Sequence, residues 1–254
     1  MGQHFLIDAR IAHRHVEFAG ITADDVVLEI GPGLGVLTRP LLERASKVVA
    51  VERDRRLAGA LRGLGGNLEV IHGDAVKVPL PRFDKVVSNL PYKISSPITF
   101  RLLDAPFDRG ALMYQAEFAE RLVARRGDEA YSRLSVNAYT RARVRILERV
   151  PKTAFWPQPK VDSAIVLVEP RPSPFRVEDE ARFRATVDAA FQHRRKAIEN
   201  ALRFSWRRFA PSPEAFDRLL DGAPHRRKRP EELTPEQFGE LADALVETRG
   251  GQKD

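Results

Sequence analysis

The chain has 254 residues, a formal net charge of +7 and no cysteine. This length suffices for one large and one small domain, and the lack of thiols excludes disulfide bonds, thiolate metal sites and cysteine catalysis. No apolar run approaches the roughly 20 residues of a membrane-spanning helix, and the N-terminus lacks the features of a secretory signal, so a cytoplasmic location is expected. The excess of arginine, much of it after residue 120, favours a nucleic-acid partner over a small-molecule substrate.

The N-terminal segment, residues 2–6, shows no periodicity and precedes a predicted helix. Asp8 is expected to cap this helix, which should run to about Ala19 and end at the glycine that follows. His13 and His15 lie on the helix without a metal-ligand partner in register. We therefore expect both histidines on the surface.

A strand, a glycine-rich loop and a helix come next. The apolar run 25–30 predicts a buried strand, which leads into glycines at 31–35 and a helix at 36–45. This order is typical of the cofactor-cradling first turn of a doubly wound α/β fold. The third glycine of the dinucleotide fingerprint falls on Val36, which argues against a nicotinamide cofactor. The acidic Glu29 before the loop would repel a pyrophosphate, so we expect a bulky ligand without one.

Two further strands end next to acidic residues. The strand predicted at 47–51 ends in Glu52, about 20 residues beyond the loop, where a carboxylate can accept both hydroxyls of a ribose. The alternative, an ordinary exposed glutamate, is disfavoured by this spacing. After a helix at 55–64, the strand at 68–71 leads to Asp74, which can accept a hydrogen bond from a nucleoside amino group.

The fourth predicted strand, at 83–87, ends in the sequence Ser-Asn-Leu-Pro-Tyr at 88–92. Proline favours extended conformations in the preceding residue, which holds the Leu90 carbonyl beside the Asn89 side chain. These two acceptors and the Tyr92 ring suit a planar group with an exocyclic amine, such as adenine. A strand end with an ordinary turn explains the motif alone equally well. The four strand ends should converge at one edge of the sheet, where ligands bind in such folds, and this favours a ligand site.

The rest of the first domain continues the sheet. We expect a helix at 117–126 and strands at 111–114, 141–150 and 161–168. Between the last two strands lies a proline-stiffened loop in which Phe155 and Trp156 are adjacent. These aromatic side chains either stack on a base or cap the core, and the sequence leaves both possibilities open.

A proline-rich linker at 170–174 divides the chain by composition. It separates a first domain, residues 1–170, from a second, residues 171–254. The second domain has a helical pattern throughout. Its apolar residues, among them Phe183 and Val187 with Phe191, have the spacing of one buried helix face.

Two basic runs mark the second domain. The first, at 193–196, contains Arg194, Arg195 and Lys196, and the second, at 225–229, precedes the last helix. Such runs either line an RNA groove or form solvated faces. We favour RNA contact for the first run, whose three cations are the predicted RNA-binding residues.

Taken together, the motifs resemble one family along nearly the whole chain. In chain order they are Gly-Gln-His-Phe-Leu at 2–6, Glu-Ile-Gly-Pro-Gly-x-Gly-x-Leu-Thr at 29–38, Val-Glu-x-Asp at 51–54, Gly-Asp-Ala at 73–75, Asn-Leu-Pro-Tyr at 89–92, Phe-Trp-Pro-x-Pro-Lys-Val-Asp-Ser-Ala at 155–164 and His-Arg-Arg-Lys at 193–196. The sequence resembles the KsgA-type rRNA adenine N6,N6-dimethyltransferases. This resemblance implies a Rossmann-like class I methyltransferase domain, with a doubly wound, mostly parallel sheet, and a small all-helical C-terminal domain.

The resemblance also implies the cofactor and the partner. S-adenosylmethionine would be the methyl donor, with no metal, and two neighbouring adenines near the 3′ end of small-subunit rRNA would be the acceptors. The chain would act as a monomer on a maturing small ribosomal subunit. The implied cofactor-binding residues are His4, Leu6, Gly31, Gly33, Glu52, Asp74 and Asn89. Glu52 would hold the ribose, and Asp74 would hold the adenine amine of the cofactor.

The target adenine would bind Asn89, Leu90 and Tyr92, with Phe155 or Trp156 on its other face. The Asn89 side-chain oxygen and the Leu90 carbonyl would accept the two N–H groups of the exocyclic amine. This favours a pyramidal nitrogen and frees its lone pair for attack on the sulfonium methyl. Positioning and electrostatics would supply most of the rate, and the base must leave its stack to reach the pocket.

Two other functions are compatible with the sequence. A resistance-type methyltransferase acting on a large-subunit rRNA adenine shares the first domain, but the run at 193–196 and the length of the second domain favour the small-subunit type. A ribosome-assembly factor that mainly binds RNA would share the fold. The intact Asn-Leu-Pro-Tyr motif favours catalysis over this second alternative.

Overall fold

The computed structural model describes residues 4–245, which form two compact units. The first unit contains the described residues up to Val123 together with Arg141–Arg171. The second contains Ala124–Thr140 together with the described residues from Pro172 onward. The sequence pattern puts residues 124–140 in the first domain, whereas the structure packs them with the second unit.

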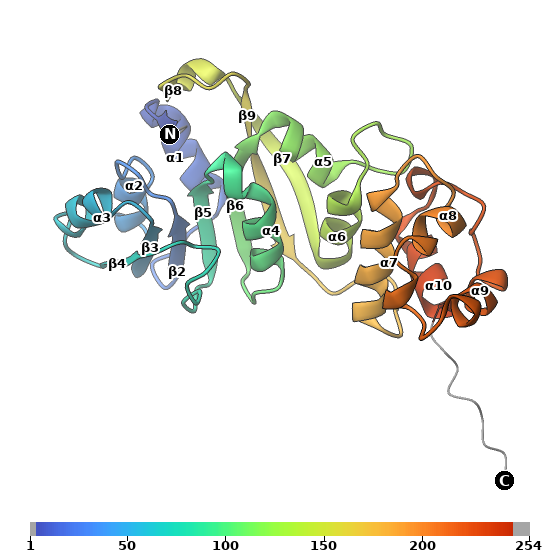
Figure 1. Ribbon diagram of the computed structural model, residues 1–254. Helices are drawn as coiled ribbons and strands as arrows, with labels where there is room; N and C mark the ends of the chain where they lie inside the picture. Colours follow the sequence, from blue (N-terminus) through green and yellow to red (C-terminus); the bar gives the residue numbers. More distant parts are fainter. Residues whose placement is uncertain (1–3, 246–254) are drawn as a thin grey trace, which may run out of the picture. The chain divides into compact units, whose positions relative to one another are not determined.

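Within residues 4–245, the first unit is built on a seven-stranded sheet with the order β4–β3–β2–β5–β6–β9–β7 (Figure 1). Its strands are β2 (Val26–Ile30), β3 (Lys47–Glu52), β4 (Leu68–His72), β5 (Lys85–Asn89), β6 (Arg109–Gln115), β7 (Ala142–Val150) and β9 (Ser163–Pro170). The pairs from β4 to β6 are parallel, whereas β9 is antiparallel to β6 and β7. A separate antiparallel pair joins β1 (Phe5–Leu6) to β8 (Phe155–Trp156).

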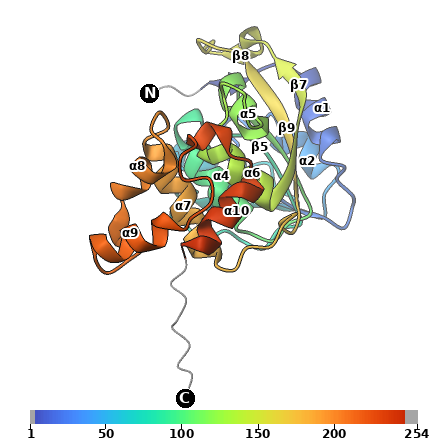
Figure 2. The ribbon, with the colours of Figure 1, turned by 90° about the vertical axis from the view of Figure 1, so that its right-hand side faces the viewer.

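Helices cover both faces of this sheet. In the first unit they are α1 (Ala9–Phe18), α2 (Thr38–Leu42), α3 (Arg55–Arg62), α4 (Ser95–Leu103) and α5 (Ala116–Val123). Side chains alternate between the faces along a strand, and Met113 packs in the cluster formed with α1 and α2. Its neighbour Tyr114 lies on the opposite face, where its hydroxyl bonds Thr99 of α4 and its ring stacks on Phe118 of α5. Figure 2 shows α1 and α2 on one side of β9 and α4 on the other.

The predicted elements are confirmed, with differences at their ends. The helix expected at 36–45 is only the short α2, because the residues after the glycine loop form turns. The helix expected at 117–126 ends at Val123. Helix α4 was not predicted, since Pro97 in its first turn, where proline is tolerated, weakens the sequence signal. Short 3-10 helices lie at Tyr92–Ile94, Lys152–Ala154, Trp206–Arg208 and Pro230–Glu232.

Helix α1 begins as predicted, because the Asp8 carboxylate accepts hydrogen bonds from the first backbone amides of the helix. His13 is exposed. His15 is completely buried, so the expectation that it lies on the surface is wrong. It falls on the helix face that carries Ile11, and its Nε2 bonds the Ala111 carbonyl at 2.8 Å. Burial lowers the pKa of His15 to about 4.

The buried neutral His15 makes stability depend on pH. The unfolded side chain takes up a proton near its ordinary pKa of 6.5, whereas the folded one does so only near 4. Between these values the unfolded state binds more protons. The contribution of His15 to the unfolding free energy should therefore fall by about 1 kcal/mol per pH unit as the pH drops through this window.

Urea denaturation of the unaltered chain and of the His15→Gln variant measures this contribution. Measurements from about pH 7.5 to about pH 4.5 cover the range in which histidine titrates. The quantity of interest is the difference between the two unfolding free energies, because other groups titrate in both proteins. Glu29 is one of them, since its raised pKa acts in the opposite direction. A difference that stays constant with pH would contradict a neutral folded His15.

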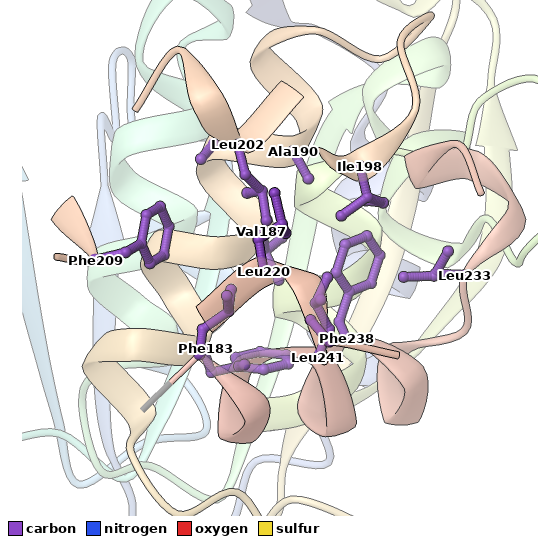
Figure 3. Close-up of a cluster of buried hydrophobic side chains, with 14 of the residues drawn as sticks. Phe183, Val187, Ala190, Ile198, Leu202, Phe209, Leu220, Leu233, Phe238 and Leu241 are labelled. Carbon is purple, nitrogen blue, oxygen red and sulfur yellow. The ribbon is translucent and has the colours of Figure 1, made fainter. Parts of the chain in front are cut away.

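The second unit is formed by packed helices around one apolar cluster. They are α6 (Arg133–Arg141) without its last residue, α7 (Glu180–Gln192), α8 (Ile198–Arg203), α9 (Pro213–Asp221) and α10 (Pro235–Ala244). Figure 3 shows Phe183 and Val187 of α7 among side chains from α8, α9 and α10. Both residues are buried and Phe191 is partly buried against the same cluster, which confirms the predicted helix face.

Tyr131 explains why residues 124–140 pack with the second unit. Its ring is buried in that unit's core, edge-on to Phe191 with 5.9 Å between ring centroids. Its hydroxyl donates to the Leu233 carbonyl at 2.9 Å, across 102 positions of sequence. In neither unit does a helix within residues 4–245 combine the length and hydropathy that a membrane crossing requires.

Candidate active site

Four parallel strands, β4, β3, β2 and β5, are neighbours in the sheet, so their carboxyl ends share one edge. The predicted convergence of the strand ends is confirmed. These ends lead to the glycine loop, Glu52, Asp74 and Asn89. In open α/β sheets this edge is where ligands bind.

The glycine loop passes close to two other segments of the first unit. Gly31, Gly33 and Gly35 have φ angles of 68°, 59° and 79°, which side chains rarely tolerate. A Cβ atom on Gly33 would lie 3.0 Å from the Phe5 ring, and one on Gly31 would lie 3.1 Å from Pro91. Glycine is therefore required both by the backbone angles and by the closeness of these neighbours.

A pocket of about 630 Å³, including the part open to solvent, lies beside this loop. Its walls come from the N-terminal segment, the glycine loop and the loop after β5. The lining residues are His4, Phe5, Leu6, Glu29, Gly31, Pro32, Gly33, Leu34, Val36, Leu37, Asn89, Leu90, Pro91 and Tyr92. Five of the seven predicted cofactor residues line it, and Glu52 and Asp74 do not. Asp74 instead accepts a hydrogen bond at 3.0 Å from the Val76 amide in the turn after β4.

Two buried carboxyl groups stand at the base of the loop. Glu29 accepts a hydrogen bond from Thr38 Oγ1 at 2.7 Å, and Glu52 accepts from the backbone amides of Gly33 at 3.1 Å and Asp54 at 2.8 Å. Burial raises the pKa of Glu29 to about 8, although the Thr38 bond lowers it, and the charge of Glu52 adds to the rise. Glu29 is therefore protonated more readily than an ordinary glutamate, which weakens the argument that its charge repels a pyrophosphate.

The end of β5 and the loop after it are held by hydrogen bonds that leave the side-chain amide of Asn89 free. Ser88 Oγ accepts from the Ile30 amide at 2.7 Å, and the Leu90 amide donates to the Met113 carbonyl at 3.1 Å. Asn89 is half-buried and lines the pocket. Within residues 4–245 its side chain has no hydrogen-bond partner, so both its oxygen and its nitrogen are available to a ligand.

Tyr92 lines the pocket and is held by two contacts that the sequence did not predict. Its hydroxyl shares a 2.7 Å hydrogen bond with Oγ of the buried Ser163, the first residue of β9. Its ring stacks on His4 with 6.0 Å between centroids, and His4 Nδ1 donates to the Pro157 carbonyl at 2.6 Å. Partial burial raises the pKa of Tyr92, so the phenol stays protonated. The only sequence signal for Ser163 was its place in the 155–164 motif.

The adjacent aromatic residues of β8 differ in environment. Phe155 is buried in the core cluster and pairs with Leu6 across the two-stranded sheet. Trp156 is 69% exposed and lies opposite Phe5 in the same sheet. Neither lines the pocket itself. The sequence left open whether these aromatic residues stack on a base or cap the core. Phe155 is a core residue, whereas the Trp156 ring is open to a ligand.

The three predicted RNA-binding cations lie in the second unit, just after α7. Arg194 Nε donates to Glu231 at 2.8 Å, so part of its charge is engaged within the unit. Arg195 and Lys196 are exposed. Neither has an acidic partner in the part of the chain that the structure describes.

Comparison with known proteins gives the family. Residues 1–224 match the family described as ribosomal RNA adenine dimethylase. The probable ribosomal RNA small subunit methyltransferase A of Thermococcus kodakarensis is 47% identical, over 96% of this chain and 88% of that protein. The protein of the same name from Methanosarcina acetivorans is 48% identical, over 97% and 93%.

Two solved structures are similar over nearly the whole chain. A dimethyladenosine transferase from Plasmodium falciparum has a TM-score of 0.79 and 32% identity, over 93% of this chain and 95% of that one. The 23S rRNA methyltransferase ErmE has a TM-score of 0.69 and 32% identity, over 95% and 99%. These similarities confirm the predicted class I methyltransferase fold. The chain belongs to the ribosomal RNA adenine dimethylase family.

Proposed function

We propose that this chain transfers methyl groups from S-adenosylmethionine to N6 of two adjacent adenosines near the 3′ end of small-subunit rRNA, within a maturing small subunit. Family membership supports dimethylation of an rRNA adenine, and the names of relatives near 47% identity support the small subunit. The observation that carries the proposal is one pocket shared by the glycine loop and the 89–92 loop. Donor and acceptor would meet there.

The residues around the loop fit S-adenosylmethionine, which supplies a methyl group on a positively charged sulfur. We assign it to the part of the pocket lined by His4, Leu6, Gly31, Gly33 and Asn89. Glu52 would accept the ribose hydroxyls. Its carboxylate has about four acceptor positions, and the amides of Gly33 and Asp54 occupy only two of them. Asp74, at the next strand end, would accept from the adenine amine of the cofactor.

The loop after β5 would bind the target adenine. The free side-chain oxygen of Asn89 and the Leu90 carbonyl would accept the two N–H groups of its exocyclic amine, and Tyr92 would stack on its ring. Gripping both hydrogens favours a pyramidal nitrogen whose lone pair points at the methyl group. After transfer the nitrogen is positively charged and strongly acidic, so water can take its proton. Catalysis would then rest on positioning and electrostatics.

The open Trp156 ring is the better candidate for the second face of the adenine. Phe155 is packed in the core and would have to leave it to reach a ligand. Trp156 is exposed and paired with Phe5, which lines the pocket. Stacking on this ring would replace part of the stacking that the base loses when it leaves the RNA.

Radiolabelled methyl transfer to undermethylated small subunits and to large subunits tests the proposal. We expect label in small subunits only, in two adjacent dimethyladenosines once the modified bases are mapped. The similarity to ErmE makes the large subunit the alternative substrate, and label there would contradict the proposal. Tight binding to small subunits without any transfer would favour an assembly factor instead.

The bond between Tyr92 and Ser163 gives a further prediction for the same assay. Ser163→Ala and Tyr92→Phe each remove one partner of this bond, and each should lower kcat about three- to tenfold, as expected for one hydrogen bond. The KM for S-adenosylmethionine should not change, because the bond only orients the Tyr92 ring. The double variant should be no slower than Tyr92→Phe alone, since the same bond is lost. The control is Ser135→Ala, at a buried serine of the second unit. If the loss of kcat in the double variant equalled the combined losses of Ser163→Ala and Tyr92→Phe, the positioning role would be ruled out.

A further inference from the structure

The second unit leaves one phenylalanine in water beside its first basic run. Phe204 directly follows α8 and is 62% exposed. The apolar cluster of this unit takes up Phe183, Phe216 and Phe238, whereas Phe204 neither belongs to it nor packs against it. Single exposed apolar side chains are common, so the neighbours of Phe204 decide what its exposure means.

Those neighbours are rings and cations. The His193 ring lies over Phe204 with 4.2 Å between centroids, and Lys196 Nζ is 5.4 Å from the Phe204 centroid, within cation–π range. Trp206 lies two residues beyond Phe204, and the Arg207 guanidinium is 4.7 Å from its ring. Both neighbours of Phe204 come from the 193–196 run, yet the residue remains 62% exposed.

The charges around this ring are only partly compensated. Arg203 pairs with Asp217, as Arg194 does with Glu231. Arg195 and Lys196 are exposed, and neither has an acidic partner among the described residues. The exposed ring therefore lies near Lys196, whose chain neighbour Arg195 is also exposed, and no acidic side chain of the described residues neutralises either cation.

We propose that Phe204 is a stacking platform for an unpaired RNA base, and that Arg195 and Lys196 bind the phosphates beside that base. The inference rests on the proposed function, which brings rRNA to this protein. An apolar partner protein would match the ring but not the uncompensated cations. An RNA duplex would match the cations but not the ring, because its bases are already stacked on each other. A single-stranded or loop segment matches both.

Binding of the full-length protein to a labelled, mixed-sequence single-stranded RNA tests this, without cofactor and at several salt concentrations. Phe204→Ala should weaken binding about tenfold, in the range measured for loss of one stacked base. The slope of log affinity against log salt should not change, because no charge is lost. Arg195→Ala should instead lower that slope by about one. Phe204→Trp should restore the affinity, since it keeps an aromatic face.

Tyr139→Ala is the matched control, because Tyr139 is another exposed aromatic residue of the same unit and lies outside the basic run. It should bind RNA like the unaltered protein. The stacking role of Phe204 is wrong if the Phe204→Ala variant melts normally and binds the RNA with an affinity within about twofold of that of the unaltered protein. Loss of one stacked base should lower the affinity about tenfold. An equal loss on duplex RNA overturns the stacking role too. Methyl transfer by the unaltered chain is assayed separately, so the proposed function and the platform can fail independently.

Discussion

Replacing Asn89 by alanine is expected to lower the rate of methyl transfer about a thousandfold or more, while cofactor affinity changes less than about tenfold. The Asn89 side chain lines the pocket and has no hydrogen-bond partner within residues 4–245. Truncation therefore breaks no internal bond, and the loss falls on the transition state, where the amine must become pyramidal. Single-turnover transfer to undermethylated small subunits measures the rate, and calorimetry with S-adenosylhomocysteine measures cofactor binding.

Asn89→Asp is the informative companion variant. Its side chain has the same length as that of asparagine and still carries an oxygen acceptor, so this variant should retain more of the methyl-transfer rate than the alanine variant. The neighbouring bond from the Leu90 amide to the Met113 carbonyl should hold the loop in both variants, and equal melting temperatures would verify this. Undiminished turnover of Asn89→Ala on small-subunit rRNA would exclude the acceptor role.

Replacing Glu52 by alanine should weaken cofactor binding about a hundredfold. Two hydrogen bonds from ribose hydroxyls to an ionised carboxylate account for a loss of this size. The structure adds a second reason, because the Glu52 carboxylate also accepts from the Gly33 amide and so holds the glycine loop. Calorimetry with S-adenosylhomocysteine gives the affinity, and thermal unfolding shows how far the loop is loosened.

Asp54 supplies the control for this variant. It lies two residues from Glu52 and caps α3 by accepting from the Arg56 amide at 2.8 Å. Asp54→Ala should cost about 1 kcal/mol of stability as a lost helix cap but leave cofactor affinity unchanged. If Glu52→Ala bound the cofactor as well as the unaltered chain, the ribose assignment would be wrong. If both variants lost affinity equally, the cause would be local unfolding.

Much of the first unit could be predicted because its signals are local. The apolar runs before Gly31 and before Ser88 predict β2 and β5, whose interiors are buried on both faces. The carboxyl ends of parallel strands meet at one edge of a doubly wound sheet, so the place of Asn89 near the glycine loop was expected from the fold class and the order of elements together. The pocket contains Asn89 and the predicted glycines, together with flanking residues such as Phe5 and Leu34, but neither Glu52 nor Asp74 lines it.

Whether an individual side chain is buried or exposed could not be predicted in the same way. His15 was expected on the surface, and Glu29 was expected to carry a charge, yet each is buried and has its pKa moved away from the ordinary value. The adjacent Phe155 and Trp156 look alike in sequence, whereas β8 turns one into the core and the other to solvent. Desolvation causes the pKa shifts of His15 and Glu29. The burial of a side chain depends on which elements cover it and not on its sequence neighbours.

The sequence by itself determined the order of the four parallel strands β2 to β5, the glycine loop, the acceptor motif and the helical character of the chain after residue 174, because each is encoded in consecutive residues. Only the tertiary structure decided that Tyr131 carries residues 124–140 into the second unit, across 102 positions, and that Ser163 holds Tyr92, across 71. Contacts over such separations depend on how whole elements pack. No periodicity specifies them, and the bond from Ser163 holds the Tyr92 ring that is proposed to meet the target base.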